Sequence, residues 1–179
     1  MKFKIILIIS TIISSLFLPA CSEDKTSQIR QCPGIEVHFS PNGGVTQSIV
    51  SGIDDAKTSI HLNVFSFTSK PIAEALIRAY DRGVNVLIVA DRENLGNPNS
   101  AIPSLSEHGI LVFIDDKHSI AHNKVIIVDD SLVFTGSFNI SKAAEESNSE
   151  NSIAIYDPIT ANIYQDNWEL HRNHSKIYK

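Results

Sequence analysis

The residues with the clearest capacity for chemistry lie between positions 122 and 150 of this chain. His122 and Lys124 are two positions apart, and Ser137 and Asn139 repeat that spacing further along. On an extended strand, side chains two positions apart lie on the same face, so each pair presents two polar groups together. An imidazole is a candidate nucleophile, an ammonium is a compact charge suited to a phosphate oxygen, and a hydroxyl and an amide supply neutral donors. These residue types indicate chemistry on a phosphate ester.

Two residues between these pairs have structural interpretations. Strand alternation places Asp129 on the opposite face from His122 and Lys124, which predicts a structural or interfacial role for its carboxylate. Gly136 directly precedes Ser137, and a residue without a side chain allows two backbones to approach closely. Asn139 is also a candidate N-cap for the helix that follows it, a role compatible with binding phosphate.

The other histidines and the cysteines give weaker signals. His118 and His122 are four apart, a spacing that suits zinc on a helix, but the β-rich run after them argues against a helix there. His171 and His174 are interpreted as part of a solvated helix end. We therefore expect no metal and no cofactor in the active site.

Alternating strand-like and helix-like runs must position these residues. Apolar or β-branched runs predict strands at 35–39, 59–67, 84–90, 110–114, 125–128, 132–135 and 153–156. Helical spacing and Pro or Gly boundaries predict helices at 45–56, 71–80, just before 108–109, at 141–146 and at 158–168. A tight turn is expected at 129–131. The pattern predicts an α/β fold in which a mixed β-sheet is sandwiched between helices.

The spacing of these residues resembles a known family signature. The pattern His-x-Lys-x4-Asp-x6-Gly-Ser-x-Asn is complete, and its members are His122, Lys124, Asp129, Gly136, Ser137 and Asn139. This pattern is similar to that of the phospholipase D superfamily. The stretches 39–41, 53–59, 66–68 and 136–151 also resemble the small secreted bacterial endonucleases of that superfamily. The resemblance implies a phospholipase D-like domain over 35–179, with one motif per chain, that acts as a phosphodiesterase without a metal.

The resemblance also implies a role for each residue. His122 would attack phosphorus and form a phosphohistidine, while Lys124, Ser137 and Asn139 would bind the non-bridging oxygens. Glu150 matches the acidic partner that orients the histidine, although a solvated strand-edge acid is the plainer interpretation. A second histidine must protonate the leaving oxygen, and the chain carries one motif. The resemblance implies a homodimer with a composite active site.

Composition limits the choice of substrate. Without its first 20 residues the chain carries 13 basic and 20 acidic residues, a formal charge of about −7, so nucleic-acid binding must depend on a local site. We expect a nucleic acid, DNA or RNA, to be the substrate. The alternatives are a phospholipase D-type hydrolase acting on phospholipid, and a non-catalytic binding protein with the same fold.

The N-terminal segment predicts export to the periplasm or the medium. Lys2 and Lys4 precede an apolar run over 5–18, which as a helix would extend about 21 Å, short of the ~30 Å needed to span a bilayer. Residues 1–20 are therefore interpreted as a signal peptide and 21–34 as a linker. Cys21 follows a sequence that resembles a lipoprotein processing site. Four outcomes remain open: lipidation of Cys21, which would attach the chain to a membrane, a disulfide between Cys21 and Cys32, simple cleavage nearby, and retention of the segment as an uncleaved anchor.

Overall fold

The computed structural model describes residues 34–179 of the chain. The predicted signal peptide, Cys21, Cys32 and all but the last residue of the predicted linker lie outside these described residues. Within residues 34–179, no helix combines the length and the apolar character required to cross a bilayer.

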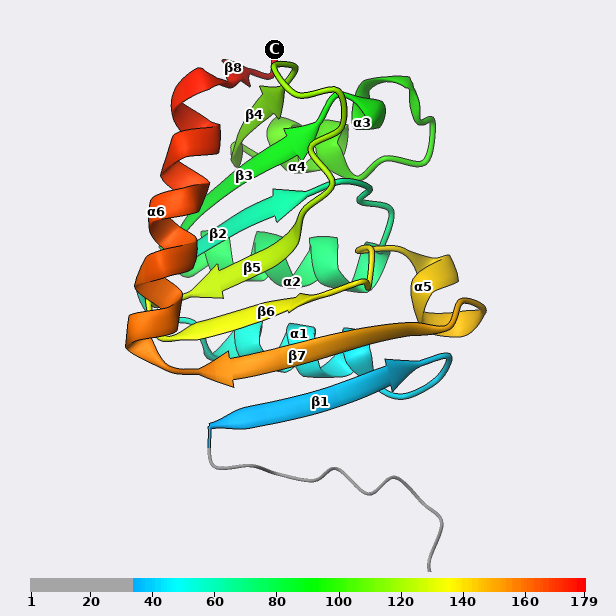
Figure 1. The fold of residues 1–179 in the computed structure, drawn as a ribbon. Coiled ribbons are helices and arrows are strands. Elements are labelled where there is room, and N and C mark those ends of the chain that lie inside the picture. Colours follow the sequence, from blue (N-terminus) through cyan, green and yellow to red (C-terminus); the bar gives the residue numbers. More distant parts are fainter. Residues whose placement is uncertain (1–33) are drawn as a thin grey trace, which may run out of the picture.

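A mixed sheet of eight strands forms the centre of the described part of the chain (Figure 1). In spatial order the strands are β1 (Ile35–Ser40), β7 (Glu150–Tyr156), β6 (Leu132–Gly136), β5 (Lys124–Val128), β2 (Ser59–Val64), β3 (Asn85–Asp91), β4 (Leu111–Asp115) and β8 (Lys176–Ile177). β2, β3 and β4 run parallel to one another, and every other neighbouring pair is antiparallel. The α/β fold with a mixed sheet is confirmed.

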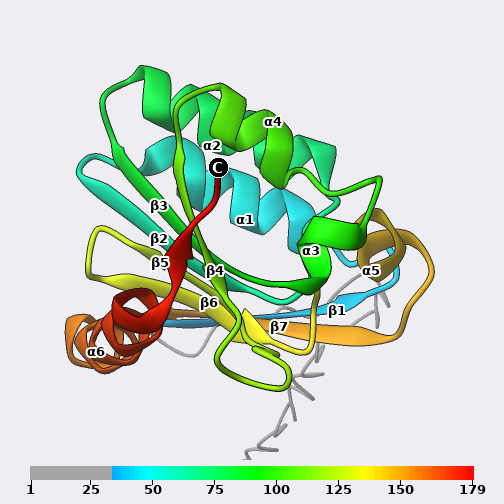
Figure 2. The same cartoon turned by 90° about the horizontal axis from the view of Figure 1, so that it is seen from above.

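Helices cover both faces of this sheet (Figure 2). α1 (Val45–Asp55), α2 (Lys70–Asp81) and α4 (Ile102–Glu107) lie on one face, and α6 (Pro158–His174) lies on the other. Two short helices, α3 (Glu93–Gly96) and α5 (Lys142–Glu146), lie in the connections that follow β3 and β6. The sheet is therefore enclosed between two helical layers, as the sequence pattern predicts.

Alternation along the central strands supplies a core to each layer. On β5, Ile126 and Val128 belong to the larger core, whereas Val125 and Ile127 pack on the opposite face with Trp168 of α6. Both faces of this strand are buried, which explains its continuous apolar sequence. The indole nitrogen of Trp168 donates a hydrogen bond of 2.7 Å to the Leu62 carbonyl oxygen, so α6 is also held directly to the backbone of β2.

A tight turn joins β5 to β6. Asp129 and Asp130 have φ values of 49° and 50°. They are the central residues of a turn closed by a hydrogen bond of 3.1 Å from the Ser131 amide to the Val128 carbonyl, and Asp tolerates positive φ better than most residues. The predicted turn is confirmed.

Several elements differ from the prediction. β7 begins at Glu150, three residues before the predicted start, and the short helix α3 was not predicted. α6 continues to His174, six residues beyond the predicted end at Trp168, and the two-residue strand β8 was not predicted. β2 ends at Val64, and Phe67 makes only an isolated bridge to Ile140. The last turns of α6 are polar, so hydrophobic periodicity cannot reveal them; their side chains instead contact groups distant in sequence.

Candidate active site

The ends of several strands bring the predicted residues to one side of the sheet. β5 is antiparallel to both β2 and β6, so its first residue, Lys124, lies beside the last residue of β2, Val64. β6 ends at Gly136, which pairs with Ser152 near the start of β7. We call this region, formed by Phe65, His122, Lys124, Ser137 and Glu150, the active-site edge; it lies to the right in Figure 1.

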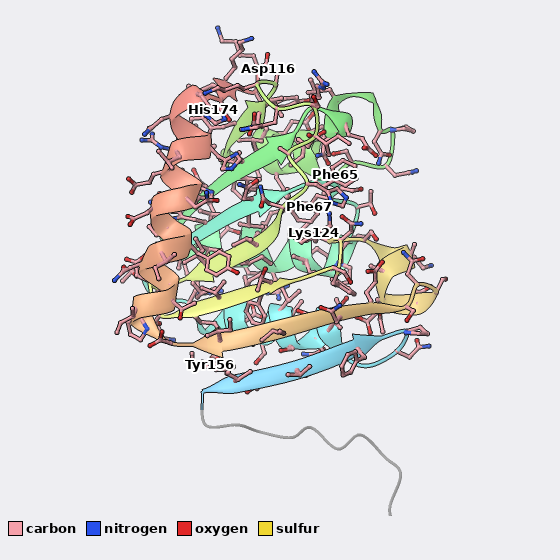
Figure 3. The ribbon with its side chains drawn as sticks, in the orientation of Figure 1. Phe65, Phe67, Asp116, Lys124, Tyr156 and His174 are labelled. Atoms are coloured by element: carbon pink, nitrogen blue, oxygen red, sulfur yellow. The ribbon has the colours of Figure 1, made fainter. Side chains whose placement is uncertain are left out.

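His122 and Lys124 meet around an aromatic ring. The His122 ring packs edge-on against Phe65 with 4.6 Å between ring centroids, and the Lys124 Nζ lies 4.9 Å from the centroid of the same ring. Figure 3 shows Phe65 and Lys124 together at this edge. Lys124 Nζ also donates a hydrogen bond of 3.0 Å to the His122 carbonyl oxygen. Phe65 therefore positions both groups, by aromatic and cation–π contact.

Backbone contacts fix the segment that carries His122. It precedes β5 and is bound to the ends of β2 and β3: the Ala121 amide donates to the buried Asp91 carboxylate at 2.6 Å, and the Phe65 amide donates to the Asn123 carbonyl at 2.9 Å. His122 therefore lies between two residues whose backbones are held by neighbouring strands. A nucleophile gains from such restriction, because it does not have to be ordered during the reaction.

Ser137 and Glu150 form a hydrogen-bonded pair across β6 and β7. The Ser137 hydroxyl donates to Glu150 Oε2 at 2.6 Å and accepts from the Asn151 amide at 3.1 Å. Glu150 Oε1 accepts from Asn148 Nδ2 at 3.1 Å. Among the hydrogen bonds of the described residues, none joins Glu150 to His122, and the orientation of the histidine by this carboxylate stays a prediction. The register of β6 against β7 places Glu150 beside Ser137.

Gly136 and Asn139 shape the turn after β6. Gly136 has φ 148°, and a Cβ at this position would lie 2.4 Å from the Asn151 carbonyl oxygen, so the predicted close approach of two backbones is confirmed. The N-cap of α5 is Ser141, whose hydroxyl accepts from the Ala144 amide at 3.1 Å, so the prediction that Asn139 caps this helix is wrong. Ser141 is the residue directly before the helix. Asn139 Oδ1 is buried and has no hydrogen-bond partner within residues 34–179.

Asp129 lies at the opposite end of β5 from Lys124. Its carboxylate accepts the backbone amides of Lys57 and Thr58 at 2.8 Å and of Ser59 at 3.0 Å, and it also accepts the Thr58 hydroxyl at 2.8 Å. Burial alone would raise the pKa of Asp129, but these hydrogen bonds outweigh it and lower that pKa. The carboxylate binds the β5–β6 turn to the start of β2, a structural arrangement away from the active-site edge.

Lys124 is the principal cation at the active-site edge. Its partial burial lowers its pKa, while the nearby carboxylates of Glu150 and Glu93 act in the opposite direction. An ammonium that is partly removed from water interacts more strongly with a bound phosphate than an exposed one does. The edge thus combines an imidazole on a fixed backbone, a partly desolvated cation, and hydroxyl and amide groups. This combination suits attack on a phosphodiester with stabilisation of the charge that develops.

Phe65 and the buried Asp91 were not predicted as parts of the site. Phe65 follows β2 within an apolar run, and Asp91 ends β3, so each resembles an ordinary core or loop residue in sequence. Their one signal is position, because both lie at carboxyl ends of parallel strands, where α/β proteins place their sites.

The fold and the site together define a phosphodiesterase of the α/β class. A family described as "Cardiolipin synthase, PLD-like domain" matches residues 49–172, and the chain belongs to the phospholipase D superfamily. The sequence resemblance is thereby confirmed.

Similar proteins support the assignment of the chain as a phosphodiester hydrolase. The chain is 42% identical over 147 residues to a phospholipase D of Rickettsia conorii, which covers 82% of this chain and 70% of the relative. It is 31% identical to the mitochondrial cardiolipin hydrolase of Xenopus laevis, with 86% and 73% covered. The structure of Nuc, a phospholipase D family member from Salmonella typhimurium, matches with a TM-score of 0.77 and 39% identity, covering 81% of this chain and 97% of Nuc. The protein is a phosphodiester hydrolase of this superfamily.

Proposed function

We propose that this protein is an endonuclease that cleaves DNA or RNA through a covalent phosphohistidine at His122, without a metal in the active site. The observation that carries the proposal is the extent of the match to Nuc, of which 97% is covered. Nearly the whole of Nuc is therefore matched by this chain, and the sequence resembles the small secreted endonucleases of the superfamily. The non-catalytic alternative is set aside by the assignment to a family of phosphodiester hydrolases.

The reaction would proceed in two displacements. In the first, a nitrogen of His122 forms a bond to phosphorus while the bond from phosphorus to the leaving oxygen breaks, and an acid gives that oxygen a proton. Lys124, Ser137 and Asn139 would stabilise the non-bridging oxygens of the five-coordinate transition state. In the second, water loses a proton to the conjugate base of that acid and attacks phosphorus, and the N–P bond breaks. His122 is regenerated, and the phosphate remains on one product.

The acid in this scheme would come from a second copy of the chain. All seven histidines lie in the described residues, and the side chains of the six others have partners that are not residues of the active-site edge. His38 contacts Glu36 and the Gly43 carbonyl, His61 stacks on Trp168, His108 pairs with Asp81, and His118, His171 and His174 contact Asp115. A homodimer that brings two His122 side chains to one phosphorus would supply both nucleophile and acid.

The substrate is tested by parallel assays on the protein without its N-terminal segment, all in excess EDTA. Supercoiled plasmid, single-stranded RNA, phosphatidylcholine vesicles and cardiolipin vesicles are incubated with the wild type, His122→Ala and His108→Ala. We expect nicking or degradation of nucleic acid by the wild type and His108→Ala, and none by His122→Ala. Release of phosphatidic acid from vesicles without nucleic-acid cleavage would overturn the proposal. Loss of all activity in EDTA with recovery on adding a cation would overturn the metal-independent mechanism.

One observation favours the lipid alternative enough to keep it in the test. Ile120, two residues before His122 in the sequence, exposes 59% of its surface, and an exposed apolar side chain suits contact with an acyl chain. The named functions of the Rickettsia and Xenopus relatives also concern lipids. The vesicle assays address this alternative directly, and Ile120→Ser would weaken lipid hydrolysis more than nucleic-acid cleavage if lipid were the substrate.

Export of the chain is a separate proposal that depends on the composition of residues 1–20. Expression of the full chain in a bacterium followed by intact-mass measurement tests it. A mature form beginning at Cys21 with an added diacylglycerol would support the lipoprotein form, and an unmodified form beginning near Cys21 would support simple secretion. Recovery of the protein only in the cytosolic fraction, with Met1 and its neighbours retained, would contradict export.

A further inference from the structure

Four potential metal ligands gather at the carboxyl end of β4, two strands along the sheet from β2 and outside the five residues of the active-site edge. Asp115 is the last residue of β4, His118 lies in the loop after it, and His171 and His174 are in the last turn of α6. Figure 3 shows His174 at this end, away from Lys124 and Phe65. We call these four residues the Asp115 cluster. It joins segments that are more than fifty residues apart in sequence.

The three imidazoles surround one carboxylate oxygen. Asp115 Oδ2 lies 2.7 Å from His171 Nδ1, 3.0 Å from His118 Nδ1 and 3.2 Å from His174 Nε2. The ring centroids are 5.0, 5.1 and 5.4 Å apart, so the three rings form a nearly regular triangle. One ligand atom from each of the four residues lies within 4.8 Å of all the others. In a tetrahedral zinc site with bonds of about 2.1 Å, neighbouring ligand atoms are roughly 3.4 Å apart.

The surroundings hold these groups in place. The second carboxylate oxygen of Asp115, Oδ1, accepts the Lys117 amide at 3.1 Å, which leaves Oδ2 directed at the imidazoles. Such a contact beyond the ligands is a common way to orient them. His171 and His174 lie at a helix C-terminus, where the aligned peptide dipoles favour positive charge.

Burial in the cluster is graded from the carboxylate outward. The Asp115 side chain is fully buried, whereas the side chains of His171, His174 and His118 are 15%, 21% and 45% exposed. The carboxylate is therefore shielded by the rings, and the rings are reachable from solvent. An ion could therefore enter from solvent on the side of His118, the most exposed ring, and would then lie in a mostly enclosed position beside Asp115.

We propose that the Asp115 cluster is a binding site for one divalent transition-metal ion, with Zn²⁺ as the preferred ion. Three imidazole nitrogens and one carboxylate oxygen make a four-ligand set of the type that zinc accepts in tetrahedral geometry. Four protein ligands leave no open position for a reacting water, so the role is structural. The ion would bind the end of α6 to β4 and to the loop that continues to His122.

The alternative is that the Asp115 cluster binds no ion. Three neutral imidazoles can each donate an N–H to one carboxylate, and such a cluster is chemically satisfied without metal. The two arrangements make opposite predictions for zinc uptake and for the effect of zinc on unfolding, so one set of measurements separates them.

The test uses untagged protein treated with EDTA and then dialysed into metal-free buffer. ZnCl₂ is titrated by calorimetry into the wild type, His118→Ala, His174→Ala and the double variant, and bound metal is counted after gel filtration. The matched control is His108→Ala, whose side chain is 38% exposed and whose ring contacts a single carboxylate, Asp81, at 2.8 Å. We expect one zinc per chain in the wild type and the control, at least tenfold weaker binding in each single variant, and no binding in the double variant.

Thermal unfolding gives a second readout. Zinc should raise the unfolding midpoint of the wild type and of His108→Ala by several degrees, and leave the double variant unchanged, because a ligand stabilises only a state that binds it. Failure of the wild type to bind zinc at micromolar concentration, or equal binding by the double variant, would overturn the proposal. Neither measurement involves a substrate, so its outcome is independent of the proposed nuclease activity.

Discussion

His122 and His118 are four residues apart in the sequence, yet the structure gives their imidazoles opposite environments. His118 shares a buried carboxylate with two other rings. Burial disfavours the charge on Asp115, but the three imidazole contacts outweigh this and hold its pKa well below the usual range. The His122 ring instead packs edge-on against Phe65, and the hydrogen bond from Lys124 Nζ is accepted by the backbone carbonyl of His122 and not by its ring.

This contrast separates two uses of one residue type. In the Asp115 cluster the ring nitrogens face a carboxylate within the same chain, so they serve the fold. At the active-site edge the backbone of His122 is fixed while its ring contacts carbon atoms, so its nitrogens are available for chemistry. Within the described residues, His122 differs from His118 in having no in-chain carboxylate on its ring, which suits the nucleophilic role proposed for it.

The largest expected effect tests this contrast directly. His122→Ala should lower turnover of a phosphodiester by roughly 10⁴-fold or more, because it removes the nucleophile. His118→Ala should leave turnover close to the wild-type rate at temperatures well below unfolding, while lowering the unfolding midpoint. Initial rates on bis(p-nitrophenyl) phosphate and thermal unfolding curves measure the two quantities. Comparable losses of turnover in both variants would contradict the division between the two regions.

Replacement of the cation should have the next largest effect. Lys124→Gln keeps a polar group of similar length but removes the charge, so we expect a loss of about 10²–10³-fold, chiefly in kcat. The control is Lys142→Gln, since Lys142 is an exposed lysine paired with Glu146 four residues away. Steady-state kinetics on the same substrate provide the measurement. A change confined to KM would mean that Lys124 contributes only to ground-state binding.

A mixing experiment tests whether the active site needs a second His122 from another copy of the chain. Wild type and His122→Ala are unfolded together, refolded at varied ratios and assayed at constant total protein. If a heterodimer with one histidine is inactive, activity should follow the square of the wild-type fraction. A linear dependence, or full activity in a monomer measured by light scattering, would show that one chain carries the whole site.

The smallest effect concerns Asp129, a motif residue whose carboxylate is occupied by the backbone. Asp129→Asn should lower the free energy of unfolding by about 2 kcal/mol at neutral pH, since charge-assisted hydrogen bonds are lost. The folded-state pKa of Asp129 is lowered, so its stabilising contribution is complete above the unfolded pKa near 4 and is lost as pH falls through the folded value. Urea unfolding should therefore show the difference from wild type shrinking below about pH 4.

The control for this last prediction is Asp130→Asn, since Asp130 is the neighbouring turn residue with φ 50°, a conformation that Asn tolerates well. We expect it to change stability little at any pH. A pH-independent loss for Asp129→Asn, or a full loss of turnover in that variant at temperatures where it is folded, would contradict a structural role.

Local pattern predicted most of this fold. The apolar runs of β3 and β5 are buried on both faces, so their composition alone indicates central strands, and the β5–β6 turn follows from two adjacent aspartates. α6 was predicted to end early because its final turns carry polar residues. Their partner, Asp115, lies far away in sequence, and no local pattern contains that contact.

The parts of the site that depend on the spacing of residues along one strand could be predicted from the sequence. His122 and Lys124 are brought together because they are two positions apart in extended backbone. The partner of Glu150 depends on how β6 aligns with β7, and the contribution of Phe65 depends on the packing of β2 beside β5. Both contacts join segments that are distant in sequence, so no local sequence pattern predicts them. His171 and His174 had one signal in the sequence, a three-residue spacing on a helix. That spacing could not predict a cluster of metal ligands, because the cluster also needs Asp115, which is distant in sequence.

The β5–β6 hairpin has a consequence for which changes in length the chain tolerates. Val125 pairs with Thr135, and continuing this register sets Lys124 opposite Gly136, one residue before Ser137. One extra residue in the Asp129–Asp130 turn, if absorbed by sliding β6 along β5, would move Ser137 by about 3.3 Å and reverse the faces of the following side chains. The site therefore tolerates an insertion in this hairpin only where the loop itself takes up the extra residue and leaves the register of β6 against β5 unchanged.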